Sequence, residues 1–388
     1  MATSSPPLVS KYYVQYHGHD IGDLELVHDA LRYAAPEDCG RARPIIWLAG
    51  DSSFDNKHWF RNAAPACNGM ERVLDPPRSK QDIAYWINRL AADRGLDCAA
   101  VNCAVEESTV QARACGRLLE QDRFLRDNVR ECDTVCVSVG GNDIALAPAP
   151  CTIASILALV CCTPRCCIDH CACGCALPID DCCCGCGSGF LSNCLACPPG
   201  LGYLIHLFHV RIQAYVERLI DGACKPRRVC VCMIYYLDED AEAQSWANRT
   251  LSALGYNRDP RKLQAIIRTI FAAATRRIRI AGTEVVAVPL FAALDGSDSA
   301  DYAARVEPSA AGGRKIADLL LAAAATGAAG ASADGSVRPD QGSLAAHEVL
   351  DQDDSHGYGA TASSGSVDGA IAMERLWARI EREHSARP

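Results

Sequence analysis

The stretch "PIIWLAGDSSFDN" (residues 44–56) leads from an apolar segment directly into Gly50, Asp51 and Ser52. A continuous rather than alternating apolar run predicts a strand that is covered on both faces. Ser52 is then either a nucleophile at the end of a buried strand or an ordinary turn residue. The turn is the commoner role of serine and aspartate at strand ends, so the rest of the chain has to decide.

Four further apolar runs predict the remainder of a parallel sheet. They are residues 97–102, 134–140, 228–236 and 283–290. Apolar residues at helical spacing predict helices within residues 79–93, 108–129, 204–220 and 260–280. Strand alternating with helix predicts right-handed crossovers. We therefore expect an α/β fold, a three-layer α/β/α sandwich with a flavodoxin-like parallel sheet of about five strands.

The composition argues against several classes of protein. The formal net charge is −9, and no basic run is long enough to attract nucleic acid locally. No apolar segment approaches the roughly 20 residues that span a bilayer. The first ten residues lack the basic start and apolar segment of a secretory signal. We expect a cytoplasmic protein, with a weak organelle address as the alternative and the oligomeric state left open.

The chain divides into a main domain and several appended segments. We expect an N-terminal extension over 1–40, the α/β domain over 41–325 with a cysteine-rich insert over 151–200, a low-complexity linker over 326–369 and an amphipathic helix over 370–388. The small residues of the linker bury too little area to offset their ordering entropy. Met373, Leu376, Trp377 and Ile380 share one helical stripe that can dock on the body or on a partner.

Polar residues follow three of the predicted strands. Ser52 follows the first strand, Glu107 the second, and Gly141, Asn142 and Asp143 the third. Because the carboxyl ends of parallel strands share one edge of the sheet, we expect these residues to gather there. An acyl-transfer site needs a nucleophile, donors for an oxyanion and a base. Ser52 and the Asn142 amide can supply the first two.

Three separated motifs resemble the blocks of the SGNH hydrolase superfamily, also called GDSL-type esterases and lipases. They are "GDSSFDN" (50–56), "VSVGGNDIAL" (137–146) and "VEPSAAGGRKIADLL" (306–320). The resemblance covers roughly residues 40–325 apart from the insert. It implies a serine hydrolase or acyltransferase that acts on a small-molecule or lipid ester without a cofactor. It also implies that Ser52 is the nucleophile and that Asn142 contributes to the oxyanion hole.

The same resemblance implies which residues support the loops around the oxyanion. They are Gly50, Asp51, Asn102, Glu107, Gly141 and Asp143. Alignment from Asn102 places Glu107 where the family has a glycine N–H donor. A carboxylate beside an oxyanion repels it unless it is turned away or protonated. Either the Glu107 side chain points elsewhere or the substrate is cationic at that point.

The last block departs further from the family pattern. The family reads Asp-x-x-His-Pro, whereas this chain reads Ala304-Arg305-Val306-Glu307-Pro308. Glutamate ionises near pH 4.3 in water and is a poor base near neutrality, but burial and nearby carboxylates raise its pKa. Our hypothesis is a Ser52–Glu307 dyad. The alternative base is His356, with Asp353 as its partner.

The acids Glu106, Asp298 and Asp301 lie near the same edge, and we expect them to be solvated.

Two other functions remain open beside ester hydrolysis. One is a catalytically lapsed SGNH-like binding or scaffolding protein. The other is a metal-binding protein that acts through its cysteine-rich insert.

The insert holds most of the 24 cysteines. Three interpretations of the insert remain open. Its C-x-C and C-C steps can bind Zn or Cu, or its thiols can carry acyl chains that anchor the protein to a membrane. The third is that the insert is a redox-dependent or simply tolerated loop expansion. The candidate metal ligands are Cys161, Cys162, Cys166, Cys167, Cys171, Cys173, Cys175, Cys182, Cys183, Cys184 and Cys186. The scattered cysteines, such as Cys136, Cys230 and Cys232, are expected in the core.

Overall fold

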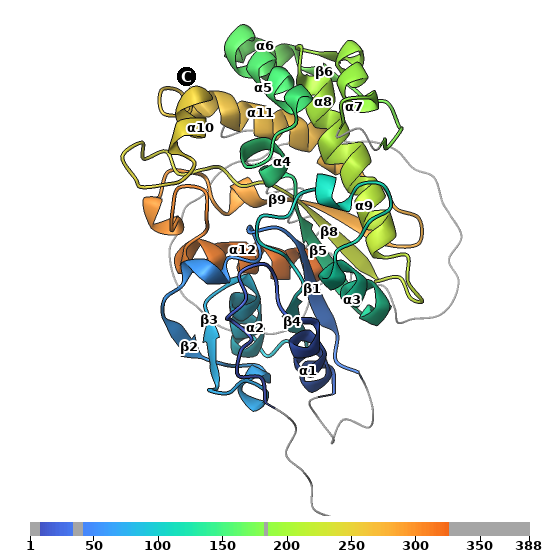
Figure 1. Ribbon diagram of the computed structural model, residues 1–388, viewed down its shortest axis with the longest axis vertical. Coiled ribbons are helices and arrows are strands. Elements are labelled where there is room, and N and C mark those ends of the chain that lie inside the picture. The colour runs from blue at the N-terminus through green and yellow to red at the C-terminus, as the bar shows by residue number, and fades with distance from the viewer. Residues whose placement is uncertain (1–7, 34–41, 182–184, 326–388) are drawn as a thin grey trace, which may run out of the picture. The chain divides into compact units, whose positions relative to one another are not determined.

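The computed structural model describes residues 8–33, 42–181 and 185–325, and it contains a five-stranded parallel sheet (Figure 1). Its strands, in spatial order, are β4 (Ala99–Asn102), β1 (Ile45–Gly50), β5 (Thr134–Ser138), β8 (Arg228–Met233) and β9 (Glu284–Pro289). The chain leaves β1 for one neighbour, β4, and returns to the other, β5. The three-layer α/β/α prediction is confirmed, as are all five predicted strands.

The centre of the sheet is fully buried. Every residue of β1 and of β8 is buried, as expected for strands covered on both faces. Ile46 pairs with Thr134 and Gly50 with Ser138, so β1 and β5 end at the same level. This register places the loops after the two strands side by side.

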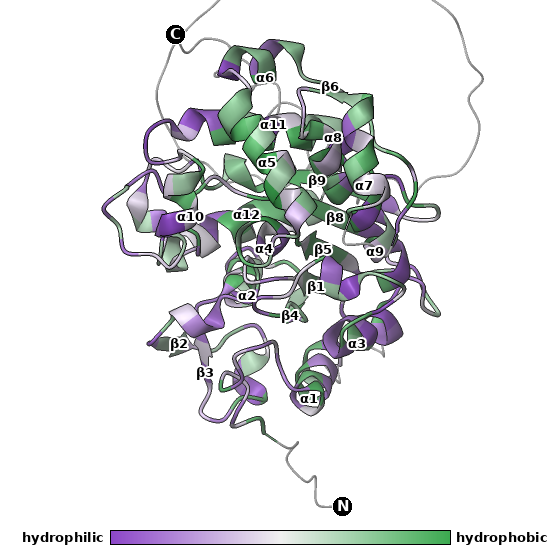
Figure 2. Cartoon of the chain, turned by 45° about the horizontal axis from the view of Figure 1, so that its top comes forward, coloured by the Kyte–Doolittle hydropathy of each residue, from purple (hydrophilic) through white to green (hydrophobic). Residues whose placement is uncertain are grey.

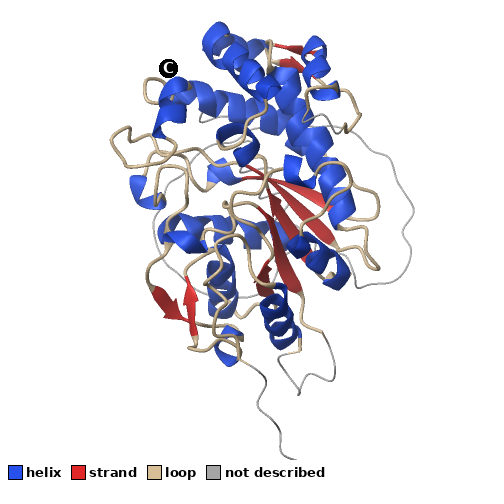
Figure 3. Cartoon of the chain, viewed as in Figure 1, coloured by secondary structure: helices blue, strands red, loops and turns tan. Residues whose placement is uncertain are grey.

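Helices cover both faces of the sheet (Figures 1 and 3). They include α1 (Ile21–Arg32), α2 (Ile83–Asp93), α3 (Glu120–Asn128), α9 (Ile212–Leu219), α11 (Pro260–Ala273) and α12 (Ala310–Ala325). α2 and α12 pack together, with the Arg314 guanidinium 5.6 Å from the Trp86 ring centroid. α1 contacts α3, and α3 contacts α9.

α1 is tied to the body by a buried ion pair. The Arg32 guanidinium donates to Asp133 at 2.6 Å, and both side chains are inaccessible to solvent. The same carboxylate accepts bonds from Ile45 N and Trp47 Nε1, each at 2.9 Å. The last part of the predicted N-terminal extension therefore packs on the sheet domain.

The helix predicted over residues 108–129 is wrong in its first half. Only Glu120–Asn128 forms α3. The N–H groups of Val110 and Gln111 donate to the Asp143 carboxylate instead of to helical carbonyls. Cys115 (φ 58°) and Gly116 (φ 75°) have left-handed backbone angles, which a helix cannot include.

The cysteine-rich insert folds as short helices beside the sheet domain. It contains α5 (Pro150–Cys162), α6 (Arg165–Cys171), α7 (Ser188–Leu191) and two short strands, β6 (Cys173–Gly174) and β7 (Ala196–Cys197). It continues into α8 (Leu201–Ile205) and a π-helical turn over His206–Arg211. α5 packs on α8, and α6 packs on α11. The insert is thus held against the main helices.

The remaining elements are short. They are α4 (Gly141–Ala145), α10 (Asn248–Ala253) and the antiparallel pair β2 (Ala63–Pro65) and β3 (Arg78–Lys80). Among the described residues no single helix is long and apolar enough to span a membrane. α5 and α6 reach that length and apolarity only together, and the chain bends by 103° between them. The predicted linker, the C-terminal helix and the Asp353–His356 pair lie outside the described residues.

Candidate active site

The turn that carries Ser52 depends on a glycine at the end of β1. Gly50 has φ 132°, and a Cβ atom at this position would lie 1.7 Å from the Ser138 carbonyl oxygen of β5. Only glycine tolerates both conditions. After Gly50 the chain turns over Asp51, whose carboxylate accepts from Ser53 N (3.1 Å) and from Ser53 Oγ (2.7 Å). Asp51 therefore braces the turn and leaves Ser52 at its tip.

Ser108 links the turn after β1 to the one after β5. Its hydroxyl donates to the Gly50 carbonyl at 2.9 Å, and its own carbonyl accepts from Asn142 Nδ2 at 3.0 Å. An amide NH2 group has two donors, so Asn142 keeps a second N–H for another acceptor. The loop after β4 thus holds the serine turn and the Asn142 amide in one arrangement.

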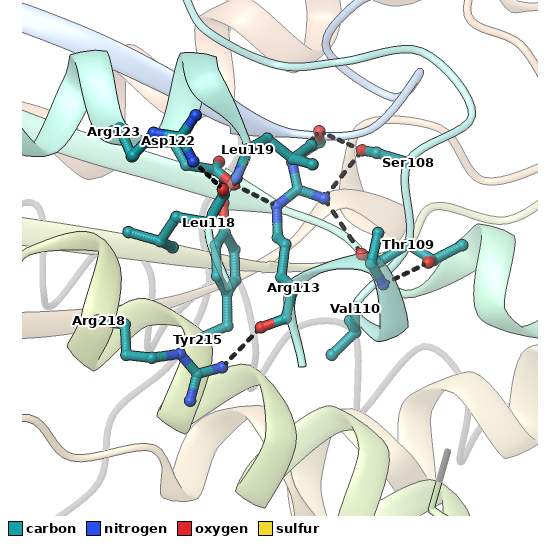
Figure 4. A network of polar contacts seen from close by, with 12 residues as sticks. Ser108, Thr109, Val110, Arg113, Leu118, Leu119, Asp122, Arg123, Tyr215 and Arg218 are labelled. Atoms are coloured by element: carbon teal, nitrogen blue, oxygen red, sulfur yellow. Dashed lines mark hydrogen bonds and ion pairs between the residues drawn. The ribbon is translucent and has the colours of Figure 1, made fainter. Parts of the chain in front are cut away.

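A buried arginine in the loop after β4 completes this arrangement (Figure 4). The Arg113 side chain is inaccessible to solvent and donates to Gly50 O (3.0 Å) and to Ser108 Oγ (2.9 Å). Its Nε donates to Asp122 of α3 at 2.8 Å, and Asp122 also accepts from Tyr215 of α9 at 2.8 Å. Arg113 therefore connects the strand end to two helices.

Two other predicted support residues lie in the same loops. Asn102 Nδ2 donates to the Phe54 carbonyl at 3.0 Å, so it holds the serine turn from the end of β4. Asp143 accepts from Val110 N and Gln111 N at 2.7 and 3.0 Å. Gly141 begins α4, and Asn142 lies in its first turn.

Ser52, Asn142 and Glu307 line one cavity, which has a volume of about 130 Å³. They come from the loops after β1, β5 and β9. The Glu307 loop is fixed on two sides: Tyr235 Oη donates to the Val306 carbonyl at 2.7 Å, and Asn56 Nδ2 donates to the Pro308 carbonyl at 3.2 Å. The cavity lies where the strand order reverses between β1 and β5, as ligand sites in open parallel sheets do.

The Glu307 carboxyl is almost completely buried, with 3% of the residue exposed. Burial raises its pKa well above the ordinary value, and the neighbouring Glu106 and Asp51 carboxyls raise it further. The nearby Ser52 hydroxyl and Trp246 act in the opposite direction, because donors favour the ionised form, but they are outweighed. Glu307 is therefore a weak acid that lies near the Ser52 hydroxyl in the same cavity.

Glu106 and Asp51 belong to the same group of buried acids. Burial, followed by the charge of Asp55, raises the pKa of Glu106 to about 8, and burial raises that of Asp51 to about 6. The expectation that Glu106 is solvated is wrong, because its backbone N–H binds the buried Asp55 carboxylate at 2.9 Å and only 3% of the residue is exposed.

The same expectation is wrong for Asp301 and right for Asp298. Asp301 is 2% exposed and accepts from Lys315 Nζ at 2.7 Å. Asp298 is exposed; it accepts a local bond from Ala300 N and lies 3.6 Å from Lys315 Nζ. The partner of Asp301 is Lys315 of α12, which lies 14 residues further along the chain.

Glu107 occupies the position where the family has glycine, and its backbone resembles that of a glycine. Its φ is 61°, in the left-handed region that glycine favours. Its side chain is exposed and accepts from Tyr16 Oη at 3.1 Å, and it is not part of the cavity wall. Of the two alternatives, the structure has the carboxylate turned away. Among described residues, neither Ser52 N–H nor Glu107 N–H has a hydrogen-bond partner.

No histidine of the described part of the chain lines the cavity. His58 is exposed next to the serine turn. His206 is buried in the insert region and is bonded to the Ile179 carbonyl at 2.9 Å. The alternative base His356 lies outside the described residues. Among the described residues, Glu307 is the predicted base that lines the cavity together with Ser52.

The cysteines divide as the sequence suggests. Cys136, Cys230 and Cys232 are buried in the sheet, so the prediction of core cysteines is confirmed for them. In the insert, Cys186 forms a disulfide with Cys151 and is not available as a thiolate ligand. The described candidates are mostly exposed, namely Cys161, Cys162, Cys166, Cys171, Cys173 and Cys175, with Cys167 half-buried.

Over residues 8–33, 42–181 and 185–325, no three histidine, cysteine or acidic side chains are grouped so as to hold a metal ion. Cys182, Cys183 and Cys184 lie outside these ranges. A zinc or copper site in the insert therefore stays a prediction, as does acylation of its thiols.

Sequence reasoning missed Ser108, Arg113 and Trp246. Ser108 and Arg113 lie in a segment whose apolar spacing indicated a helix, so their polar side chains had no evident partner. Trp246 lies in a polar loop after β8. The role of Arg113 is evident only from its hydrogen bond to the Gly50 carbonyl, which lies 63 positions earlier in the chain.

Similar folds occur among solved structures, although no model of a known family and no curated protein sequence matches the chain. One is described as a GDSL-like lipase from Parabacteroides merdae (13% identity, TM-score 0.38, 73% of this chain and 95% of the other). Two are family 3 carbohydrate esterases. The one from Clostridium thermocellum has 12% identity and a TM-score of 0.33, and the match covers 72% of this chain and 93% of the other. The one from Talaromyces cellulolyticus has 11% identity and a TM-score of 0.33, and the match covers 71% and 94% of the two chains. Identities and TM-scores this low carry no argument about function, so the proposed function rests on the geometry of the cavity alone.

Proposed function

We propose that the protein is an SGNH-type serine hydrolase or acyltransferase that acts on an oxygen ester. The observation that carries this proposal is that the Ser52 hydroxyl, the buried Glu307 carboxyl and Asn142 line one cavity. A hydroxyl, a proton acceptor and an amide donor are the parts that acyl transfer needs.

The chemistry follows from these positions. In its ionised form Glu307 accepts the Ser52 proton while Ser52 Oγ attacks the acyl carbonyl. The Ser52 N–H and the second N–H of Asn142 stabilise the oxyanion. Glu307 then gives the proton to the leaving alcohol as the C–O bond breaks. Water, deprotonated by the same carboxylate, releases the acid from the acyl-enzyme and regenerates Ser52.

A carboxylate can replace the family histidine only if its pKa approaches the working pH, because a base that is too weak does not take a serine proton. Burial shifts the pKa of Glu307 upward, which is the direction that this condition requires. Its partner position, Ala304, carries no acid, and a carboxylate needs none, because it has no tautomer to fix. The supports of the loop are Tyr235 and Asn56 instead.

The test is covalent labelling with a fluorophosphonate probe, located by peptide mass spectrometry. Wild type should be labelled on the peptide that contains Ser52, and Ser52→Ala should not be labelled. Glu307→Gln keeps the size of the side chain but removes the base, so labelling should slow by about 100-fold or more. Ser297→Ala, in an exposed loop, should label like wild type.

A second candidate function is a binding protein without catalysis. It is favoured by the raised pKa of Glu307, which leaves the carboxyl protonated and the serine unactivated at low pH. Absence of labelling between pH 5 and pH 10, in protein whose cooperative thermal unfolding is intact, would support this candidate and refute the hydrolase.

A further inference from the structure

The cavity beside Ser52 is polar at one end and apolar elsewhere. Ser52, Asn142 and Glu307 form the polar end. The other walls include Ile156 and Leu159 of α5, Leu204 of α8, Phe208 of the π-helical turn, and Ile266 and Ile270 of α11. Figure 2 shows α5, α8 and α11 coloured mostly as hydrophobic.

These wall residues are not exposed patches on separate elements. Leu159, Leu204, Ile266 and Ile270 are each 3% exposed or less. α5 packs on α8, and α8 contacts α11. The walls therefore enclose a space between packed helices, and the space connects directly to the serine turn.

The chemistry of the walls selects what can enter. A polar group placed among these side chains has no partner and loses its hydrogen bonds to water, which is costly. A hydrocarbon gains from leaving water, by about fourfold in affinity for each buried methylene. The alcohol of an ester is polar, so the acyl chain is the part of the substrate that suits this space.

We propose that the space between α5, α8 and α11 binds the acyl chain of a fatty acyl ester, with its carbonyl at Ser52. This inference rests on the proposed function, of which it specifies the substrate class. A part of the cysteine-rich insert then has a defined role, because α5 supplies one wall of the chain-binding cavity. The alcohol or acceptor remains outside the apolar part.

The first experiment tests binding apart from chemistry. Ser52→Ala protein is titrated with a dansyl-labelled fatty acid, which is then displaced with decanoate and, separately, with acetate. Decanoate should displace the probe and acetate should not. Adding Leu159→Trp, which places an indole in the cavity, should weaken binding at least tenfold. Leu157→Trp is the matched control, because Leu157 lies on the same helix but is 44% exposed.

The second experiment measures kcat/KM for p-nitrophenyl esters from acetate to decanoate. Wild type should gain about fourfold per methylene while the chain is being buried. Leu159→Trp should remove this gain, whereas the control Leu157→Trp should keep it. Ile270→Phe of α11 repeats the test from the opposite wall if Leu159→Trp unfolds.

The outcomes separate the two proposals. Binding and displacement without hydrolysis of any ester would refute the hydrolase but keep the chain site. Hydrolysis that favours acetate, or equal effects of Leu157→Trp and Leu159→Trp, would overturn the chain site and leave the hydrolase standing. Failure of Ser52→Ala protein to bind the dansyl-labelled probe would also overturn the chain site.

Discussion

Replacing Arg113 with methionine removes the guanidinium that joins the serine turn to α3. Arg113 and Asp122 are both inaccessible to solvent. Without Arg113, Asp122 keeps, among its partners in the described ranges, the bonds from Tyr215 Oη and Leu119 N. Breaking a buried ion pair by removing one partner costs about 3–5 kcal/mol. We expect Arg113→Met to lower the free energy of unfolding by that amount, or the melting temperature by roughly 6–10 °C.

The assay is urea unfolding followed by circular dichroism, for Arg113→Met, Asp122→Asn and the double variant. Asp122→Asn removes the charge that the arginine neutralises, so the double variant should lose at least about 1.5 kcal/mol less than the sum of the single losses. Additive losses would contradict a buried pair.

The matched control is Arg89→Met on α2. Arg89 pairs with Asp93 at 3.1 Å, but these side chains are 49% and 46% exposed. Exposed pairs contribute less than about 1 kcal/mol, so the control should unfold nearly as wild type does. If Arg113→Met is no more harmful than Arg89→Met, the loop after β4 is not held by this arginine.

Three further predictions concern the cavity edge. Gly50→Ala should prevent soluble folding, because the added Cβ would overlap the Ser138 carbonyl. The control Gly95→Ala should fold, because a Cβ there has open space although φ is also positive. Comparable soluble expression of the two variants would refute the steric reason. The labelling rate of Ser52 should rise with pH as the raised pKa of Glu307 is passed, since only ionised Glu307 is a base. Glu307→Gln should abolish this limb, and a flat profile in wild type would exclude the dyad. Glu107→Gly should stabilise the protein by about 1 kcal/mol, measured by urea unfolding, because it relieves left-handed strain at φ 61°; a loss of stability would mean that the bond to Tyr16 outweighs the strain.

The sheet and the position of the site could be read from the sequence for one physical reason. Strands covered on both faces need continuous apolar runs, so β1 and β8 stand out against polar loops. Once the strands are parallel, their carboxyl ends coincide, and Ser52 and Asn142 meet as a consequence of topology.

Other features depend on contacts between distant residues and carry no local signal. The left-handed angles at Cys115 and Glu107 could not be inferred from residue type, since neither is glycine. The burial of Glu106 depends on Asp55, 51 positions away. The apolar cavity arises from helices of three separate segments. Periodicity predicted helices over 204–220 and 260–280, but it predicted neither α5 nor the space between the helices.

The cavity draws its proposed catalytic groups and its walls from different stretches of the chain. Ser52, Asn142 and Glu307 come from loops that follow strands of the sheet, whereas α5 belongs to an excursion between β5 and α8. Shortening, lengthening or exchanging that excursion could change which molecules fit without disturbing the reacting atoms. Such a division lets protein engineers replace the excursion alone. It also lets evolution broaden or narrow the range of substrates while the residues proposed to react stay the same.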